Sequence, residues 1–228
     1  MKKFMFSIIL LLALTSFAFA YVRPMYQDIK LPSQVMVEKQ SFGTPVAAST
    51  TRLSNAIPGP TSAGGGATYP AVSITSFTLQ PDVPRNIVIT PGGTTTDVES
   101  CAVLVSGTNY FGQSISETLS FAANASAATT GAKAFKSVTS VAFPADCESG
   151  QAAATWSVGV GEKIGLKRCM DFAGEWLLSE VAGVYESTRA TVVASASAVE
   201  SNTADFNGSM DGSAEFIGFF FQNFRCSP

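Results

Sequence analysis

The sequence predicts an all-β protein, an antiparallel β-sandwich of immunoglobulin-like or jelly-roll-like type with about nine strands and an extended N-terminal arm. Between residues 80 and 166, short runs rich in Val, Ile, Phe, Thr and Ser are broken roughly every 8–12 residues by Gly, Asn, Asp or Pro. Residues 114–121 alternate between apolar and hydroxyl side chains, which is typical of a strand with one buried face.

The first twenty residues have the three parts of a secretory signal peptide. Lys2 and Lys3 precede the apolar run 4–14, and Ala18-Phe19-Ala20 gives an A-x-A end. The run is too short to span a bilayer comfortably, although a retained N-terminal anchor is the alternative. We therefore expect a secreted, extracellular or cell-surface protein that has no membrane partner after cleavage.

Residues 21–72 are predicted to be an arm or linker. Pro recurs through this segment, and Gly64-Gly65-Gly66 lies near its end, so long helices and central strands are disfavoured. Residues 34–38 alternate enough for one short strand, which makes Val35 and Val37 candidate interface residues. Such a strand could add to the sheet of a neighbouring subunit; a disordered or self-packed tail is the alternative.

The β-sandwich domain is predicted over residues 73–228. In the strand 114–121, Ile115, Leu119 and Phe121 are expected to share one face. Between Val138 and Val141 the apolar phase slips by one residue, which indicates a β-bulge near Thr139-Ser140. The predicted strands are 74–79, 86–90, 102–106, 114–121, 135–143, 154–160, 176–181, 191–198 and 215–222.

Two later segments carry further expectations. The run 216–221 is apolar on both faces, so it is predicted to be a central or an interface strand, with Phe219 and Phe221 as candidate interface residues. Residues 170–187 have loosely helical spacing but equally suit a hairpin that turns at Ala182-Gly183.

Four cysteines in an exported chain predict two disulfides, for which three pairings exist. Cys101 opens a predicted strand, Cys147 lies in the following loop region, and Cys226 lies close to the end of the chain. We favour Cys101–Cys147 and Cys169–Cys226 and leave the other two pairings open.

The composition argues against most reactive centres. The chain has no histidine, which removes histidine-dependent nucleophilic and metal sites. Acidic pairs in predicted turns, such as Asp97 with Glu99, could bind calcium through their carboxylates, but solvated turns without a metal are the preferred interpretation. We therefore expect no enzyme activity, catalytic residue, metal or cofactor. The mild negative charge disfavours nucleic acid as a partner.

Three side chains invite specific hypotheses. Glu117 shares a face with Ile115 and Leu119, so we expect a structural ion pair with Lys133 or Lys136. Trp156 and Trp176 could contact a glycan if they were exposed, whereas burial would place them in the core, which the surrounding pattern favours.

Several segments resemble a β-rich structural module of tailed-phage virions, of the head-decoration or tail-associated kind. These are PDVPRN at 81–86, TTTDV at 94–98, VSGT at 105–108, SET at 116–118, TGAKAFKSVTS at 130–140 and VGEKIGL at 160–166. TRATV at 188–192 and MDGSA at 210–214 continue the likeness, which spans about residues 74–222.

The resemblance implies a non-enzymatic assembly protein that acts through contacts with copies of itself or with a larger lattice, in a virion or on an extracellular surface. One alternative is a secreted module that recognises a glycan or a host surface. A second alternative is a fibre subunit that is joined by strand donation from residues 30–40.

Overall fold

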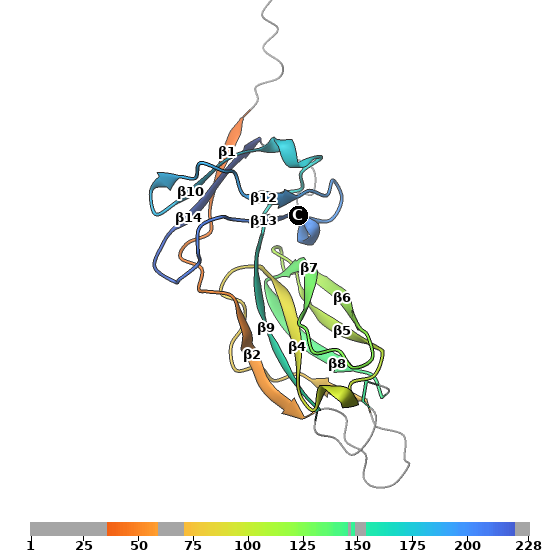
Figure 1. The fold of residues 1–228 in the computed structure, drawn as a ribbon. Helices are drawn as coiled ribbons and strands as arrows, with labels where there is room; N and C mark the ends of the chain where they lie inside the picture. The colour runs from red at the N-terminus through yellow and green to blue at the C-terminus, as the bar shows by residue number, and fades with distance from the viewer. Residues whose placement is uncertain (1–35, 59–70, 146, 149–153, 222–228) are drawn as a thin grey trace, which may run out of the picture. The chain divides into compact units, whose positions relative to one another are not determined.

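The protein is an all-β antiparallel β-sandwich (Figure 1). The computed structural model describes residues 36–58, 71–145, 147–148 and 154–221. Within these ranges the only helical elements are three 3-10 turns: Thr95–Asp97, Ala173–Glu175 and Val199–Ser201. None of the described segments forms a helix of the length and apolarity that crossing a membrane requires.

Fourteen strands form three sheets among the described residues. One sheet has the order β1 (Val37–Ser41), β14 (Phe216–Phe221), β10 (Trp176–Val181) and β11 (Val184–Tyr185). A second runs β12 (Thr191–Val193), β13 (Thr203–Asp205), β9 (Ala154–Gly165), β4 (Arg85–Gly93) and β7 (Thr129–Phe135), with β2 (Ser49–Pro58) also on β9. The third runs β3 (Val72–Ile74), β8 (Ser137–Phe143), β5 (Cys101–Thr108) and β6 (Ser114–Phe121).

The second and third sheets enclose a first core cluster, which is built around Trp156. Its indole packs edge-on against Phe121, with ring centroids 5.0 Å apart, and tilted against Phe143 at 5.1 Å. Strand β9 contributes Trp156, Val158 and Val160, and β5 contributes Val103 and Val105; all five are buried. Alternation along these strands therefore fills the space between two sheets, as in other sandwiches.

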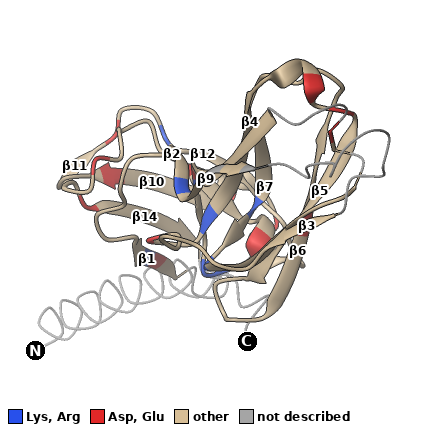
Figure 2. Cartoon of the chain, turned by 90° about the horizontal axis from the view of Figure 1, so that it is seen from below, with Lys and Arg blue, Asp and Glu red and all other residues tan. Residues whose placement is uncertain are grey.

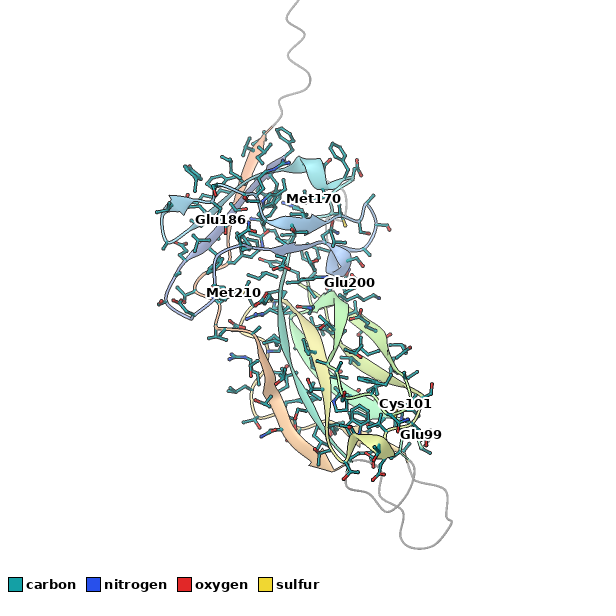
Figure 3. All side chains as sticks on the ribbon, viewed as in Figure 1. Glu99, Cys101, Met170, Glu186, Glu200 and Met210 are labelled. Carbon is teal, nitrogen blue, oxygen red and sulfur yellow. A yellow bond between two sulfur atoms is a disulfide. The ribbon has the colours of Figure 1, made fainter. Side chains whose placement is uncertain are left out.

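A second core cluster lies beneath the β1-β14-β10-β11 sheet and includes Met170 and Met210, both labelled in Figure 3. Trp176 stacks on Phe220 at 5.8 Å and meets Phe206 edge-on at 5.7 Å. Gly218 makes this packing possible, since a Cβ there would lie 2.1 Å from the Trp176 ring. The end of β9 supplies Ile164 to this cluster, so one strand contributes to both cores.

The predicted boundary at residue 72 differs from the structure. Residues 37–58 carry β1 and β2, which pair with β14 and β9 in the same compact unit as the rest of the described chain. The prolines mark where strands end: Pro45 lies between β1 and β2, and Pro58 closes β2. Residues 21–35 of the predicted arm and the predicted signal peptide lie outside the described residues.

Several local predictions are confirmed. Strands 114–121 and 176–181 have the expected bounds. Thr139 is left over between the pairs Ser106↔Ser140 and Gly107↔Val138, so the bulge lies where the apolar phase slips. The hairpin β10–β11 turns at Ala182 and Gly183, both of which have positive φ, and the helical alternative is excluded.

Other predicted strands have different bounds. The single strand expected at 135–143 is two, β7 and β8, separated by Lys136, and the strand expected at 191–198 ends at Val193. The strand expected at 74–79 is only the short β3. The structure also has β1, β2, β11 and β13, so that, with the division into β7 and β8, fourteen strands replace the expected nine or so.

The disulfide Cys101–Cys147 is confirmed, with a Cα–Cα distance of 5.0 Å. It joins Cys101, which opens β5 and is labelled in Figure 3, to Cys147, the neighbour of Glu148 in the isolated bridge Val98↔Glu148. Cys169 is also disulfide-bonded, and its expected partner, Cys226, lies outside the described residues.

Candidate interaction surface

The sheet β1-β14-β10-β11 has one face over the second core cluster and one face directed away from it. Registers settle which side chains share a face, because residues opposite each other in an antiparallel pair point the same way. Phe220 and Gly218 lie over the core, as do Glu38 and Gln40 opposite them on β1. The residues of the other face, here named the outer face, are Val37, Lys39, Ser41, Leu178, Glu180, Tyr185, Ile217, Phe219 and Phe221.

The outer face is largely apolar and partly open to solvent. Val37, Leu178 and Tyr185 are 53%, 46% and 58% exposed, and Phe219 and Phe221 are half-buried. Tyr185 leans toward Phe219, with ring centroids 6.0 Å apart. Contiguous exposed apolar side chains are uncommon on monomeric proteins and mark contact sites. This face is therefore the candidate interaction surface.

Two charges flank the central strand of this face. Lys39 lies on β1 opposite Phe219, and its Nζ is 5.9 Å from the centre of that ring. Glu180 lies on β10 opposite Ile217. Because β14 separates them, the positive and the negative side chain stand on opposite sides of the apolar centre.

Polar contacts on the core side hold β1, the edge strand of this sheet. The Glu38 carboxylate pairs with Lys167 at 2.8 Å and Arg168 at 3.3 Å. Buried Gln40 accepts a hydrogen bond from the Lys167 backbone N–H. β1 is thus anchored within its own chain, so residues 37–40 could join a neighbour only by giving up these contacts; the preceding residues 30–35 lie outside the described part.

Three of the four predicted interface residues meet on the outer face. Val37 pairs with Phe221, and Phe219 is two positions along the same strand; Val35 lies outside the described residues. The sequence did not single out Leu178 and Tyr185. The outward position of Leu178 in the predicted strand 176–181 was the available signal, but only the pairing of β10 with β14 shows that it shares a face with Phe219.

The two tryptophans do not supply a glycan site. Trp156 is 0% exposed and Trp176 is 1% exposed, so neither offers a ring face to a sugar. Both indole N–H groups are satisfied internally: Trp156 donates to Glu148 at 2.8 Å and Trp176 to the Ser179 hydroxyl at 3.0 Å. The core alternative is the one that the structure shows.

Two buried charges are held as structural groups. The Arg85 guanidinium is fully buried and donates to the backbone carbonyls of Gly161 and Val46, with the Asp82 carboxylate 3.7 Å away. Burial lowers the pKa of Arg85, and Asp82 opposes that shift. Glu148, almost fully buried, accepts the Trp156 N–H, and burial raises the pKa of its carboxyl.

Glu117 does not form the predicted ion pair. Its carboxylate accepts hydrogen bonds from the backbone N–H groups of Ala132, at 2.6 Å, and Lys133, at 3.3 Å. The Lys133 ammonium instead donates to the Ser116 carbonyl at 3.0 Å and lies 3.8 Å from Glu200. Glu117 therefore links β6 to β7 by accepting hydrogen bonds from backbone N–H groups of β7. The sequence pattern indicates only lysine side chains as partners.

An open pocket of about 380 Å³ lies between residues 109–115 and 197–200. Its most buried polar side chain, Asn109, accepts from the Phe111 and Gln113 backbone N–H groups and donates to the Gln113 side chain. Because these groups are used to shape the turn, they are not available to orient a ligand.

No group of His, Cys, Asp or Glu within the described ranges is arranged to hold a metal ion. Charged side chains are sparse along the strands of the structure (Figure 2). Searches against family models, curated proteins and solved structures returned no match for this chain.

Proposed function

We propose that this protein is a non-enzymatic structural module, virion-like or extracellular, that works by binding other protein chains through the outer face. The observation that carries the proposal is an apolar, partly exposed sheet face with Leu178, Tyr185 and Phe219 at its centre. Burying such side chains against a partner removes apolar surface from water, which is the main driving force of association.

The rest of the molecule supports a scaffold. A disulfide closes the first core, the buried Arg85 guanidinium donates to backbone carbonyls, and one oxygen of the buried Glu148 carboxyl accepts from Trp156, as expected of groups that maintain a fold. A disulfide is compatible with an extracellular location. The predicted export signal and the resemblance of the sequence to phage structural modules would both agree with a role in assembly.

The test is site-specific photocross-linking in the organism that makes the protein. A photoreactive phenylalanine at position 178 is expected to give an adduct with one defined protein chain, identified by mass spectrometry. Leu104, 41% exposed on β5, provides the matched control position, where no such adduct is expected.

A variant adds a second measurement. Leu178→Asp should abolish the adduct formed from a photoreactive residue at Tyr185, because a carboxylate would have to be desolvated at the contact. Absence of any interchain adduct from positions 178 and 185 would contradict the proposal.

A further inference from the structure

The arrangement of charge on the outer face restricts what can cover it. Lys39 and Glu180 form no ion pair with other described side chains. They lie one strand away from β14 on opposite sides and two residues apart along the strands, about 12 Å apart on the diagonal, because neighbouring strands are spaced by about 4.8 Å and two residues span about 7 Å. The strands of the outer face therefore carry one cation and one anion, on opposite sides of an apolar centre and staggered along the strands; a further carboxylate, that of Glu215 just before β14, accepts a hydrogen bond from the Ser41 hydroxyl.

This arrangement of charges is complementary to itself under one symmetry operation. A twofold axis parallel to β14, between two facing copies, places β1 of one copy over β10 of the other. Lys39 would then cover the partner's Leu178, since both residues lie opposite Phe219. Its ammonium would reach the partner's Glu180, one outward residue further along, while its aliphatic stem covers apolar surface.

The other face-to-face arrangement is disfavoured. A twofold axis perpendicular to the strands would place β1 over β1 and β10 over β10. An axis at the level of Phe219 would place Lys39 over Lys39, and an axis at the level of Ile217 would place Glu180 over Glu180; neither position brings Lys39 over Glu180, and like charges in an interface oppose association. The charge pattern thus selects one arrangement out of two.

We infer that the outer face binds a second copy of this chain face to face, with its twofold axis along β14 and reciprocal Lys39–Glu180 pairs. This inference rests on the proposed function and names the partner. Phe219 and Phe221 lie along the axis, Lys39 and Leu178 flank Phe219, and the two charge pairs fix the orientation. Sheets that pack in this way lie about 10 Å apart, within reach of a lysine side chain.

The experiment exchanges the charges one at a time in the full chain and measures mass by analytical ultracentrifugation and native mass spectrometry. Lys39→Glu and Glu180→Lys are each expected to raise the dimer dissociation constant at least about tenfold, because each gives two repulsive pairs. An equimolar mixture should restore association as a heterodimer. In that heterodimer the carboxylate introduced at position 39 meets the ammonium introduced at position 180, and the unchanged Lys39 meets the unchanged Glu180.

Circular dichroism and the melting temperature verify that both variants fold; if either does not, Lys39→Gln and Glu180→Gln replace them and should each weaken the dimer. A mixture that dissociates as readily as the single variants would overturn the inference, as would a wild-type protein that stays monomeric at high concentration. If the position-178 adduct contains a different chain, the dimer is excluded while the proposed function stands. If no adduct forms, both fail.

Discussion

Strands β6 and β14 alternate in the same way but present different chemistry to solvent. The outward residues of β6 are Ser114, Ser116, Thr118 and Ser120, all of them exposed. On β14 the corresponding residues are Phe219 and Phe221, which are half-buried, and Ile217, which is already buried within the chain. Hydroxyl side chains keep their hydrogen bonds to water and suit a solvated face, whereas phenylalanine loses nothing when a partner covers it. The contrast separates a surface built for water from one suited to contact.

The two core clusters differ in how they are secured. The first has a disulfide, the Glu117 link between β6 and β7, and a buried Trp156–Glu148 hydrogen bond. The second depends on stacked aromatic rings over Gly218 and on the anchoring of β1 by Glu38. The two clusters therefore differ in the interactions that stabilise them. Because β9 contributes side chains to both clusters, we expect the two clusters to unfold together.

Replacing the central tryptophans tests whether the clusters unfold together and should have the largest effect. Trp156→Ala and Trp176→Ala are each expected to reduce the free energy of unfolding by about 3–5 kcal/mol, because each removes a fully buried indole. Urea denaturation followed by far-ultraviolet circular dichroism should show one transition in both variants. Two transitions, only one of which moves, would mean that β9 does not couple the clusters.

Removing the disulfide should have the next largest effect. The double substitution Cys101→Ser and Cys147→Ser is expected to cost about 2–4 kcal/mol, since the bond constrains the unfolded chain. Denaturant midpoints measure the loss, with Ala102→Ser, an exposed neighbour on β5, as the control. An unchanged midpoint would show that the first cluster does not need the cross-link.

The link between β6 and β7 should contribute less. Glu117→Gln is expected to cost about 1–2 kcal/mol, because it weakens hydrogen bonds from the Ala132 and Lys133 backbone to a charged acceptor. Glu162→Gln, exposed on β9, is the matched control and should leave the melting temperature unchanged. Equal melting temperatures for both variants would remove Glu117 from the account of stability.

The sequence predicted the features that depend on nearby residues. Alternation fixed the bounds of β6, a phase slip located the bulge at Thr139, and Ala182-Gly183 marked a hairpin. Features that depend on distant pairing were missed. β1 and β2 lie in a proline-rich segment, and only their pairing with β14 and β9 shows that they are strands. β14 follows β1 by more than a hundred residues in the chain.

The candidate site divides in the same way. Phe219 and Phe221 could be predicted as interface residues, because a strand that is apolar on both faces must pack against the core on one face and against something else on the other. The charge pair could not, because Lys39 and Glu180 are neighbours of β14 only through two separate registers. Glu117 was recognised as a side chain that needs a partner, but the backbone donors that satisfy it are not visible in residue types.

The smallest effect should come from the buried acid of the first cluster. Burial raises the pKa of Glu148, partly opposed by the hydrogen bond from Trp156, with a further rise from the nearby Asp97 carboxylate. A carboxyl whose pKa is higher in the folded state contributes stability that is complete below the unfolded pKa, about 4.3, and is lost as the pH rises through the folded value.

The free energy of unfolding should therefore fall more steeply between about pH 4.3 and neutral pH in the wild type than in Glu148→Gln, which cannot titrate. Denaturation at a series of pH values measures the two slopes. Gln keeps an oxygen for the Trp156 N–H, so the comparison isolates the charge from the hydrogen bond. Parallel slopes would mean that Glu148 ionises as easily in the folded chain as in water, and that its burial beside the disulfide carries no electrostatic cost.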